Sequence, residues 1–455
     1  MIKNIINHKG VFGLLFSFAL STSLFVFTGC SRFEENDSFD ESAALRIVHF
    51  NESLKSRLVE QSTNGNNGWV IQYFVAGTGD VDFEGFNLYG RFYNDGKVTL
   101  AGNHRFLRNG NANKYTEFNS LYDVVKEEGP VLAFNSWNDV LTVFTDPVDP
   151  ASAPNNLVKN GEGMCGDQNL VFHGYEGNNI LFSGQRYASR VRFVPCDRPW
   201  QDYIKDTEVT KNYITNSVIT SYYVVCGTDT LYFTNLRSGV ITYCERVYDP
   251  LFPSIVNCVF TPNGFCLQHR NRIGRTSFQD FSLSPDKTHL VSENDSVQVI
   301  PTWDNYIVNA RSSVWNFDQD NFSEEQKALL AQIDVEAKKF NKDYSLDKVG
   351  LGRSTGSGAV KGLVFTFKVK NKTNTAGLSL TTVRPQFGQM KIAYSDDEKP
   401  DRNLTTMANK CNIETLARQF AATLSGTYDM IPDNYFLPTG CELHGVGNDN
   451  IYILK

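Results

Sequence analysis

Short segments rich in aromatic and β-branched residues, each ended by a tight turn, follow one another along the first half of the chain. Residues 86–103, FNLYGRFYNDGKVTLAGN, show the pattern most clearly, with Asn94, Asp95 and Gly96 as the turn. Such spacing is typical of consecutive antiparallel strands. The sequence therefore predicts a mainly β protein, or β-rich α+β, built of antiparallel up-and-down meander sheets or barrel-like domains with a few flanking helices.

The same pattern predicts further strands on both sides of the middle of the chain. Residues 115–147 predict three strands, with 135–138 as the turn between the last two, and residues 169–196 predict three more. Beyond them the pattern returns at 221–226, 230–235, 239–247, around a turn at 262–264, and at 363–369, 376–384 and 388–394.

Three helices are expected beside these strands. The first covers 37–61, where Ser38 and Glu41 fit a capping box. The second covers 323–340, with Ser323 as its cap and acidic residues in its first turn. The third covers 413–424 and ends before Gly426.

Residues 195–209, PCDRPWQDYIKDTEV, interrupt the strand pattern and predict a domain boundary. Removal of a leader would leave 426 residues, too many for one hydrophobic core. The expected division is a lipoprotein signal peptide at 1–29, an acidic tether at 30–37, a helix with an antiparallel β domain at 38–205, and a β-rich C-terminal domain with two helices at 206–455.

The first thirty residues have the form of a secretory signal. Lys3 and Lys9 precede an apolar run at 11–27, which is shorter than the roughly 20 residues of a membrane-spanning helix. The tetrapeptide at 27–30, Phe-Thr-Gly-Cys, then resembles the lipobox of bacterial lipoproteins, with Phe27 where Leu is usual. We therefore predict cleavage before Cys30 and lipid attachment to its thiol; the alternative is an ordinary signal peptide that contains a cysteine.

A lipid on Cys30 would hold the mature protein on a membrane without spanning it. Glu34, Glu35 and Asp37 follow, and this acidic cluster resembles the surface-export signal of Bacteroidota lipoproteins. A solvated tether explains it equally well. The expected location is the outer membrane, on the cell surface, with the periplasm-facing leaflet as the alternative.

Charge and cysteine content exclude some function classes. The formal net charge of −7, with no basic block, argues against nucleic acid as a partner. Eight cysteines remain beside Cys30, an even number that permits disulfides, and proximity in sequence favours Cys411 with Cys441. The sequence has neither a CxxC pair nor an HExxH motif, so we predict no metal site and no cofactor.

No motif identifies catalytic residues, so none is predicted. Residues 352–358, GRSTGSG, are expected to be a flexible loop, because a nucleophile elbow needs Gly-x-Ser-x-Gly after a strand and before a helix, and Thr355-Gly-Ser357-Gly fails that test. Most of the aromatic residues are expected in sheet cores. Trp137 lies in a predicted turn and is the one candidate for a ligand contact at the surface; the alternative is a ring folded back over the sheet.

Several stretches resemble an uncharacterised Bacteroidota lipoprotein family, domain of unknown function 4302. They are FDESAALR, NGWVIQYF, GFNLYGRFYNDGKVTLA, GPVLAFNSWNDVLTVFTDP, GDQNLVFHGYEGNNILFSGQR and FTPNGFCL, in the family's order between Phe39 and Leu267. The resemblance implies a place beside outer-membrane nutrient uptake, with a TonB-dependent transporter and its SusD-like lipoprotein as partners. It carries no catalytic residues.

Two functions follow as hypotheses. The first, which we favour, is a non-catalytic surface lipoprotein that binds a glycan or peptide, or serves as an accessory component, in a TonB-dependent (SusC/SusD-like) uptake system. The alternative is a surface hydrolase acting on glycan or peptide. A pocket with convergent carboxylates or histidines would favour the hydrolase, and an open aromatic groove would favour binding.

Overall fold

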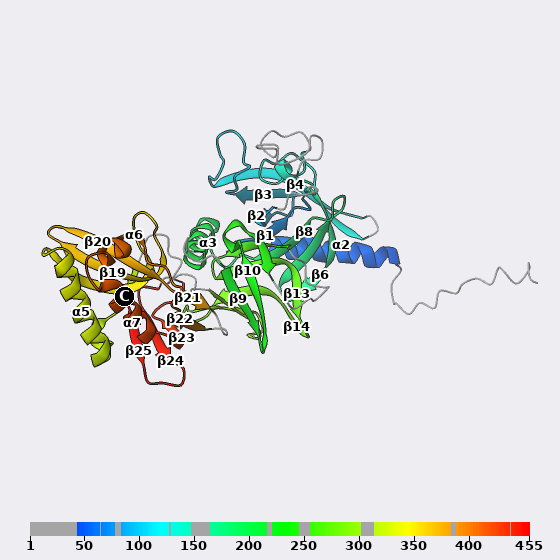
Figure 1. Ribbon diagram of the computed structural model, residues 1–455. Coiled ribbons are helices and arrows are strands. Elements are labelled where there is room, and N and C mark those ends of the chain that lie inside the picture. The colour runs from blue at the N-terminus through cyan, green and yellow to red at the C-terminus, as the bar shows by residue number, and fades with distance from the viewer. Residues whose placement is uncertain are drawn as a thin grey trace, which may run out of the picture.

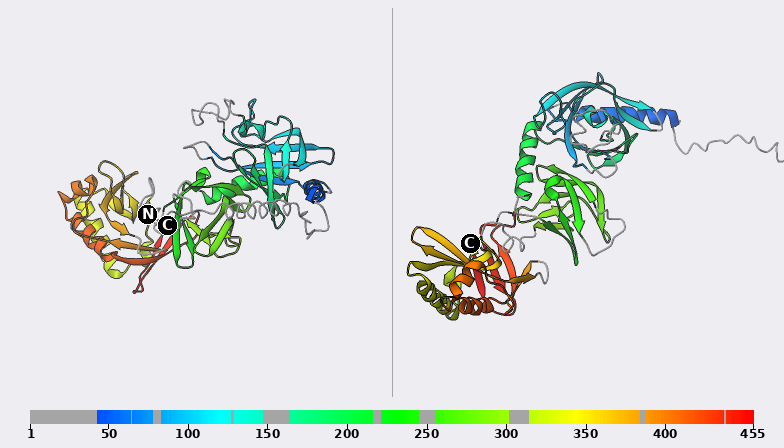
Figure 2. Two further views of the ribbon diagram at one scale, coloured as in Figure 1. Left: turned by 90° about the vertical axis from the view of Figure 1, so that its right-hand side faces the viewer. Right: turned by 45° about the horizontal axis from the view of Figure 1, so that its top comes forward.

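The computed structural model describes residues 43–63, 65–77, 83–126, 129–146, 164–215, 221–244, 255–301, 314–383, 388–436 and 438–455. The predicted signal peptide, tether, Cys30 and the capping box at 38–41 lie outside these residues. Within them, two closed barrels and a C-terminal α+β region follow one another in a bent row (Figures 1 and 2). The predicted β-rich, antiparallel, barrel-like fold is confirmed.

The first barrel is an eight-stranded antiparallel meander closed by pairing of its first and last strands. Its strands are β1 (Trp69–Phe74), β2 (Phe86–Phe92), β3 (Lys97–Gly102), β4 (Thr116–Lys126), β5 (Pro130–Phe134), β6 (Asn169–Glu176), β7 (Asn179–Gly184) and β8 (Arg190–Pro195). Alternation directs Ile71, Tyr73, Val191 and Phe193 into the core. Helix α2 (Ala43–Glu60) adds further apolar side chains to that core.

The second barrel repeats this plan of eight antiparallel strands. Its strands are β9 (Ser221–Cys226), β10 (Asp229–Thr234), β11 (Val240–Cys244), β12 (Ile255–Thr261), β13 (Gly264–Ile273), β14 (Thr276–Leu283), β15 (Leu290–Ser292) and β16 (Gln298–Pro301), with the short helix η3 (Leu236–Ser238) after β10. Pairing of β16 with β9 closes it.

Helix α3 (Trp200–Ile214) connects the two barrels, in the region where the sequence predicted a domain boundary. Its first turn packs Trp200 and Tyr203 against the outside of the first barrel, and Ile214 at its end joins the core of the second. Pro199 directly precedes the helix, and proline is well tolerated at a helix start although it reads as a breaker in sequence. The predicted division at residues 205 and 206 therefore falls inside a helix.

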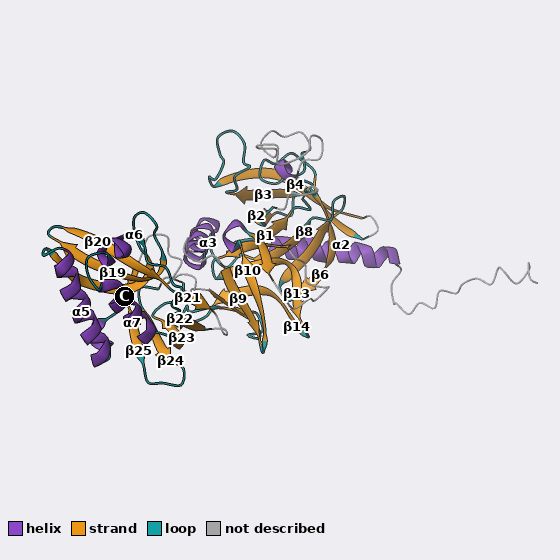
Figure 3. Ribbon diagram, in the orientation of Figure 1, coloured by secondary structure: helices purple, strands orange, loops and turns teal. Residues whose placement is uncertain are grey.

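The C-terminal region contains two sheets that share one core. The first has β17 (Val314–Asn316), β18 (Tyr344–Arg353), β19 (Lys361–Val369) and β20 (Lys372–Ser379); the second has β21 (Thr381–Val383), β22 (Gln389–Ala393), β23 (Gly426–Pro432), β24 (Cys441–Gly445) and β25 (Ile451–Leu454). Two reciprocal backbone hydrogen bonds of 2.9 Å between Asn316 and Lys455 join them. The helices η4 (Gln319–Asn321), α5 (Glu324–Phe340), α6 (Arg402–Ala408) and α7 (Ile413–Thr423) accompany the sheets (Figure 3).

Helices were predicted correctly where a helix-capping residue is followed by a periodic apolar face. Helix α5 begins as predicted, because Ser323 accepts from the Gln326 backbone N–H while the Gln326 side chain accepts from the Ser323 N–H. Helix α7 is also confirmed within one residue. The third strand expected within 115–147 is wrong: residues 142–144 form the short helix η1 (Thr142–Phe144), whose three side chains are buried. No described helix has the length and apolarity needed to span a membrane.

Asp167 organises one end of the first barrel. Its carboxylate, 5% exposed, accepts from the backbone N–H groups of Arg186, Tyr187 and Ser189 at 2.8 to 3.2 Å. Its own backbone N–H and C=O both bind the hydroxyl of Tyr73, at 2.6 and 2.8 Å. Gly184 is required beside it, since a Cβ there would lie 1.8 Å from Asp167 Oδ2.

Replacement of Asp167 by alanine is expected to lower the free energy of unfolding by about 3 kcal/mol, because buried N–H groups lose their acceptor. Urea unfolding of the purified protein measures this change. Asp229→Ala, an exposed carboxylate at the start of β10, is the matched control and should change stability by less than about 0.5 kcal/mol. Equal effects of the two substitutions would contradict the role of Asp167.

His104 is a neutral, buried histidine of the first barrel. Its Nε2 lies 2.9 Å from the Val140 carbonyl oxygen, and because that oxygen can only accept, Nε2 carries the proton. Rings of Phe86, Phe106 and Phe144 surround it at centroid distances of 4.8 to 6.4 Å. Burial lowers its pKa to about 4, against a partly opposing hydrogen bond to Val140.

Acid should therefore destabilise the fold through His104. The unfolded chain takes up the proton below its ordinary pKa of 6.5, whereas the folded chain resists until about pH 4. The stability that the neutral ring contributes is fully present above pH 6.5. It falls by roughly 3 kcal/mol as the pH drops from 6.5 to about 4. Denaturant unfolding at pH 7 and pH 4 measures how much free energy of unfolding is lost between the two, and His104→Gln should lose less than wild type. His49 is an exposed histidine on α2, and His49→Gln should lose as much as wild type.

Candidate ligand-binding site

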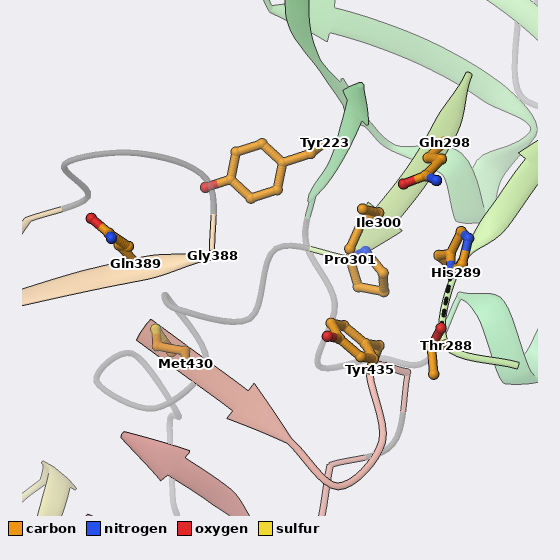
Figure 4. Close-up of a pocket in the computed structure, with 10 residues that line it drawn as sticks. All are labelled: Tyr223, Thr288, His289, Gln298, Ile300, Pro301, Gly388, Gln389, Met430 and Tyr435. Carbon is orange, nitrogen blue, oxygen red and sulfur yellow. Dashed lines mark hydrogen bonds between the residues drawn. The ribbon is translucent and has the colours of Figure 1, made fainter. Parts of the chain in front are cut away.

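A pocket of about 270 Å³ lies between the second barrel and the C-terminal region (Figure 4). The barrel contributes side chains from β9, the residues before β15, and β16; the C-terminal region contributes β22, β23 and the segment after β23. The lining residues are Tyr223, Thr288, His289, Gln298, Ile300, Pro301, Gly388, Gln389, Met430 and Tyr435. This size falls just under the roughly 300–1,000 Å³ of sites for drug-sized ligands, so a single ring-sized group fits it.

Phe436 fixes the C-terminal side of this pocket. Its side chain is fully buried in the core of the second barrel, and its ring lies 5.1 Å from that of Tyr213. The side-chain nitrogen of the neighbouring Asn434 donates to the Tyr213 hydroxyl at 3.2 Å. Because Tyr435 stands between these two anchors, its half-buried ring is held at the pocket wall.

The walls of the pocket are apolar and aromatic. Ile300, Pro301 and Met430 are buried, and Figure 4 shows the ring of Tyr223 between the barrel strands and the start of β22. Behind it, the ring of Tyr232 packs on Tyr223 at a centroid distance of 5.0 Å. Rings supported in this way keep their orientation when a ligand packs against them.

A chain of hydrogen bonds sets the tautomer of His289. The Thr288 hydroxyl donates to Asp286 Oδ1 at 2.9 Å, and the same hydroxyl oxygen lies 2.8 Å from His289 Nδ1. Since that hydroxyl proton is used on the carboxylate, Nδ1–H of His289 must donate to the hydroxyl oxygen. Nε2 of the neutral ring is then an acceptor, and Gln298 and Gln389 supply side-chain amides nearby.

The ten lining residues include no carboxylate, lysine or arginine. Two carboxylates lie next to the lining. Gln389 Nε2 donates to Asp429 Oδ1 at 2.8 Å. Asp286 is ionised at neutral pH because hydrogen bonds from Ser284 and Thr288 lower its pKa to about 2. Burial raises the pKa of Tyr435, and Asp286 raises it further. The pocket is therefore uncharged, with a negative group behind one wall, and this electrostatic setting disfavours anions.

Trp137 lies at the surface as its predicted turn position indicates, with 49% of its area exposed. Its indole N–H donates to Asp139 Oδ1 at 2.6 Å, and the guanidinium of Arg108 lies 4.5 Å from its ring centroid. Arg108 also pairs with Asp146 at 2.9 Å. The ring is thus already covered on one side by Arg108, and its role as a ligand contact stays a prediction.

The disulfide predicted between Cys411 and Cys441 is not formed: both are free thiols, like Cys165, Cys196, Cys226, Cys258 and Cys266. Cys411 Sγ donates to the Met407 carbonyl at 3.2 Å, and Cys441 is buried at the start of β24. The eleven residues of α7 follow Cys411 and carry the chain about 16 Å along the helix axis, so nearness in sequence does not become contact. Burial raises the pKa of the Cys441 thiol to about 12 and keeps it protonated.

Among the described residues, no group of three or more histidine, cysteine or acidic side chains is placed to hold a metal ion. The prediction that the chain needs no metal or cofactor stays a prediction.

Comparison with protein families matches residues 35–285, more than half of the chain, to the model described as Domain of unknown function (DUF4302). The chain belongs to this family. The DUF4302 match covers the first barrel, α3 and strands β9 to β14, and the sequence stretches that resembled the family lie within it. A search of curated proteins finds no match.

Of the ten residues at the pocket, only Tyr223 lies within the DUF4302 match. The others come from four separate segments between 288 and 435, and none forms a motif with its neighbours in sequence. Sequence reasoning missed all ten. The one available signal was the general excess of tyrosine and phenylalanine, which does not distinguish a pocket wall from a sheet core.

Proposed function

We propose that this protein is a non-catalytic binding protein for a neutral glycan, held at the outer membrane by a lipid on Cys30 and serving a TonB-dependent nutrient-uptake system. The uncharged pocket between the second barrel and the C-terminal region is the observation that carries the binding role. Its aromatic and apolar walls stand opposite amide and imidazole groups, which is the usual composition of a small-molecule site.

A sugar ring matches this composition better than a charged ligand does. The C–H faces of a pyranose pack on aromatic rings such as Tyr435, while its hydroxyl groups both donate and accept. His289 Nε2 can accept such a hydroxyl, and Gln298 can donate or accept. A neutral peptide is the other ligand class that fits, because its amides offer the same hydrogen-bonding groups.

The anchoring part of the proposal is supported by the sequence at the start of the chain. The basic residues, apolar run and Phe-Thr-Gly-Cys ending at Cys30 match a lipoprotein signal, and the acidic residues that follow suit export to the cell surface. A rigid β scaffold that presents a pocket between its parts suits capture of a nutrient close to a transporter.

Binding is tested by titrating the purified protein with a set of neutral oligosaccharides and a set of neutral peptides, using calorimetry. For the best oligosaccharide, Tyr435→Ala should weaken affinity about tenfold, because the stacking surface is lost, whereas Tyr435→Phe should retain most of it. Tyr187→Ala, a half-buried tyrosine of the first barrel, is the matched control and should bind as wild type. If only a peptide binds, the ligand is a peptide and the glycan assignment is wrong. If neither set contains a compound that binds, the binding role is overturned.

The hydrolase alternative is favoured by one observation, the hydrogen-bonded series Asp286, Thr288 and His289 at the pocket. An imidazole held in this way can act as a general base. Analysis of the titrated oligosaccharides by mass spectrometry decides between the two functions. Cleavage that is lost in His289→Gln would establish the hydrolase, and intact oligosaccharide would leave the binding role in place.

The location and partners are tested by purifying the tagged, full-length protein from its native outer membrane. We expect a TonB-dependent transporter and a SusD-like lipoprotein to accompany it, and Cys30→Ser to leave the membrane fraction because it cannot carry the lipid. A Cys30→Ser protein that stays in the membrane would contradict lipid anchoring. Recovery of the wild-type protein without a transporter would contradict the uptake role.

A further inference from the structure

A second cavity, of about 520 Å³, lies between the outer faces of the two barrels. The first barrel lines it with residues of β1, β6, β7 and β8 and with Ala188, and the second barrel lines it with residues of β13 and β14. All sixteen lining residues fall inside the DUF4302 match, in contrast to the pocket at Tyr435. We call this cavity the inter-barrel groove.

Ion pairs across the groove hold its two walls together. Arg192 of β8 donates to Asp280 Oδ1 of β14 at 2.7 Å, and Glu176 of β6 lies 3.4 Å from the same guanidinium. Arg270 of β13 binds the other oxygen of Glu176 and pairs with Glu293 at 2.7 Å. The side chain of Arg192 is only 12% exposed, so these charges form part of the built interface.

Three buried polar atoms in this wall have no hydrogen-bond partner among the described residues. One is Glu176 Oε2, which is still within ion-pair distance of the Arg192 guanidinium. The other two are Oε1 of Gln72, a buried acceptor, and Nε of Arg192, a buried donor. Gln72, with 3% of its area exposed, lies directly opposite Arg192 in the pairing of β1 with β8, so both side chains leave the same face of the sheet. An unsatisfied buried donor and acceptor side by side are costly unless a third molecule pairs with both.

Arg190 adds a positive charge two residues along the same strand. It also lines the groove, and within the described part of the chain its guanidinium has no hydrogen-bond or ion-pair partner. Arg192 and Arg270, in contrast, share three carboxylates between them. His269 lines the groove too, and burial and the charge of Arg190 lower its pKa, so it offers a neutral imidazole at neutral pH.

We propose that the inter-barrel groove is a second ligand site, which takes a small hydroxy acid such as a sugar acid. Arg190 binds the carboxylate of the ligand. A hydroxyl of the ligand donates to Gln72 Oε1 and accepts from Arg192 Nε. A hydroxyl is the simplest group that satisfies both atoms, since it carries a donor and two acceptor lone pairs.

The two sites then differ in the charge that they accept. The pocket at Tyr435 has no cationic lining and a carboxylate behind its wall, whereas the groove has one arginine, Arg190, whose guanidinium is not paired with a carboxylate of the described residues. Two sugars with the same ring, one neutral and one carrying a carboxylate, can therefore distinguish the two sites. D-glucuronate carries the carboxylate and hydroxyls, and D-glucose carries only the hydroxyls.

The test is calorimetric titration of the purified full-length protein with D-glucuronate and with D-glucose, at low salt. Glucuronate should bind, and Arg190→Gln should weaken its affinity about ten- to hundredfold, because a charge-assisted hydrogen bond is lost. Gln72→Leu, similar in shape, should weaken it severalfold. Arg272→Gln on β13 removes the same charge from an exposed residue outside the groove and should bind as wild type.

Tyr435→Ala should leave glucuronate binding unchanged, which separates this site from the one proposed above. Failure of glucuronate to bind at millimolar concentration would overturn the second site. Equal affinity for glucose and glucuronate, or an Arg190→Gln protein that binds as wild type, would overturn the assignment of Arg190. A crystal structure with glucuronate in which a water occupies the space between Gln72 Oε1 and Arg192 Nε would overturn the placement of the hydroxyl.

Discussion

In the first barrel, β1 pairs with β8 along six residues, and this closure decides which side chains face the core and which face outward. Ile71, Tyr73, Val191 and Phe193 fill the interior, and the alternating positions between them must point out of the barrel. Gln72 and Arg192 are two of those outward positions. The same register that builds the core therefore builds one wall of the inter-barrel groove, and the outer face can become a binding surface without disturbing the packing inside.

Both proposed sites lie where two folded parts meet. The inter-barrel groove depends on the ion pair between Arg192 and Asp280, and the pocket at Tyr435 depends on Phe436, which is buried in the core of the neighbouring barrel. Helix α3 contributes to the first junction, because its two ends pack on different barrels. Sites at such junctions combine side chains from distant segments, and their geometry responds to any change in the contacts that hold the parts together.

The stretch GDQNLVFHGYEGNNILFSGQR shows how a sequence resemblance translates into physical constraints. Asp167 near its start binds the backbone of the loop that follows its end, and Gly184 leaves room for that carboxylate. Both residues serve the fold of the first barrel. The stretch that contains them lies within the DUF4302 match, but neither residue carries information about a ligand. The proposals about function therefore rest on the groove and the pocket.

Sequence patterns alone determined the antiparallel strands of the first barrel, helices α5 and α7 and the β-rich class, because alternation, turn residues and helix caps act between near neighbours. Helix α3 was missed, since Pro199 resembled a break, and residues 142–144 look like a strand but form a short helix against the core. The free state of Cys411 and Cys441 and the arrangement of both proposed sites were decided by tertiary structure. Gln72 and Arg192, which are paired across β1 and β8, and Tyr223 and Tyr435, which line the same pocket, are more than a hundred positions apart in sequence. Only barrel closure and packing between the folded parts bring such residues together.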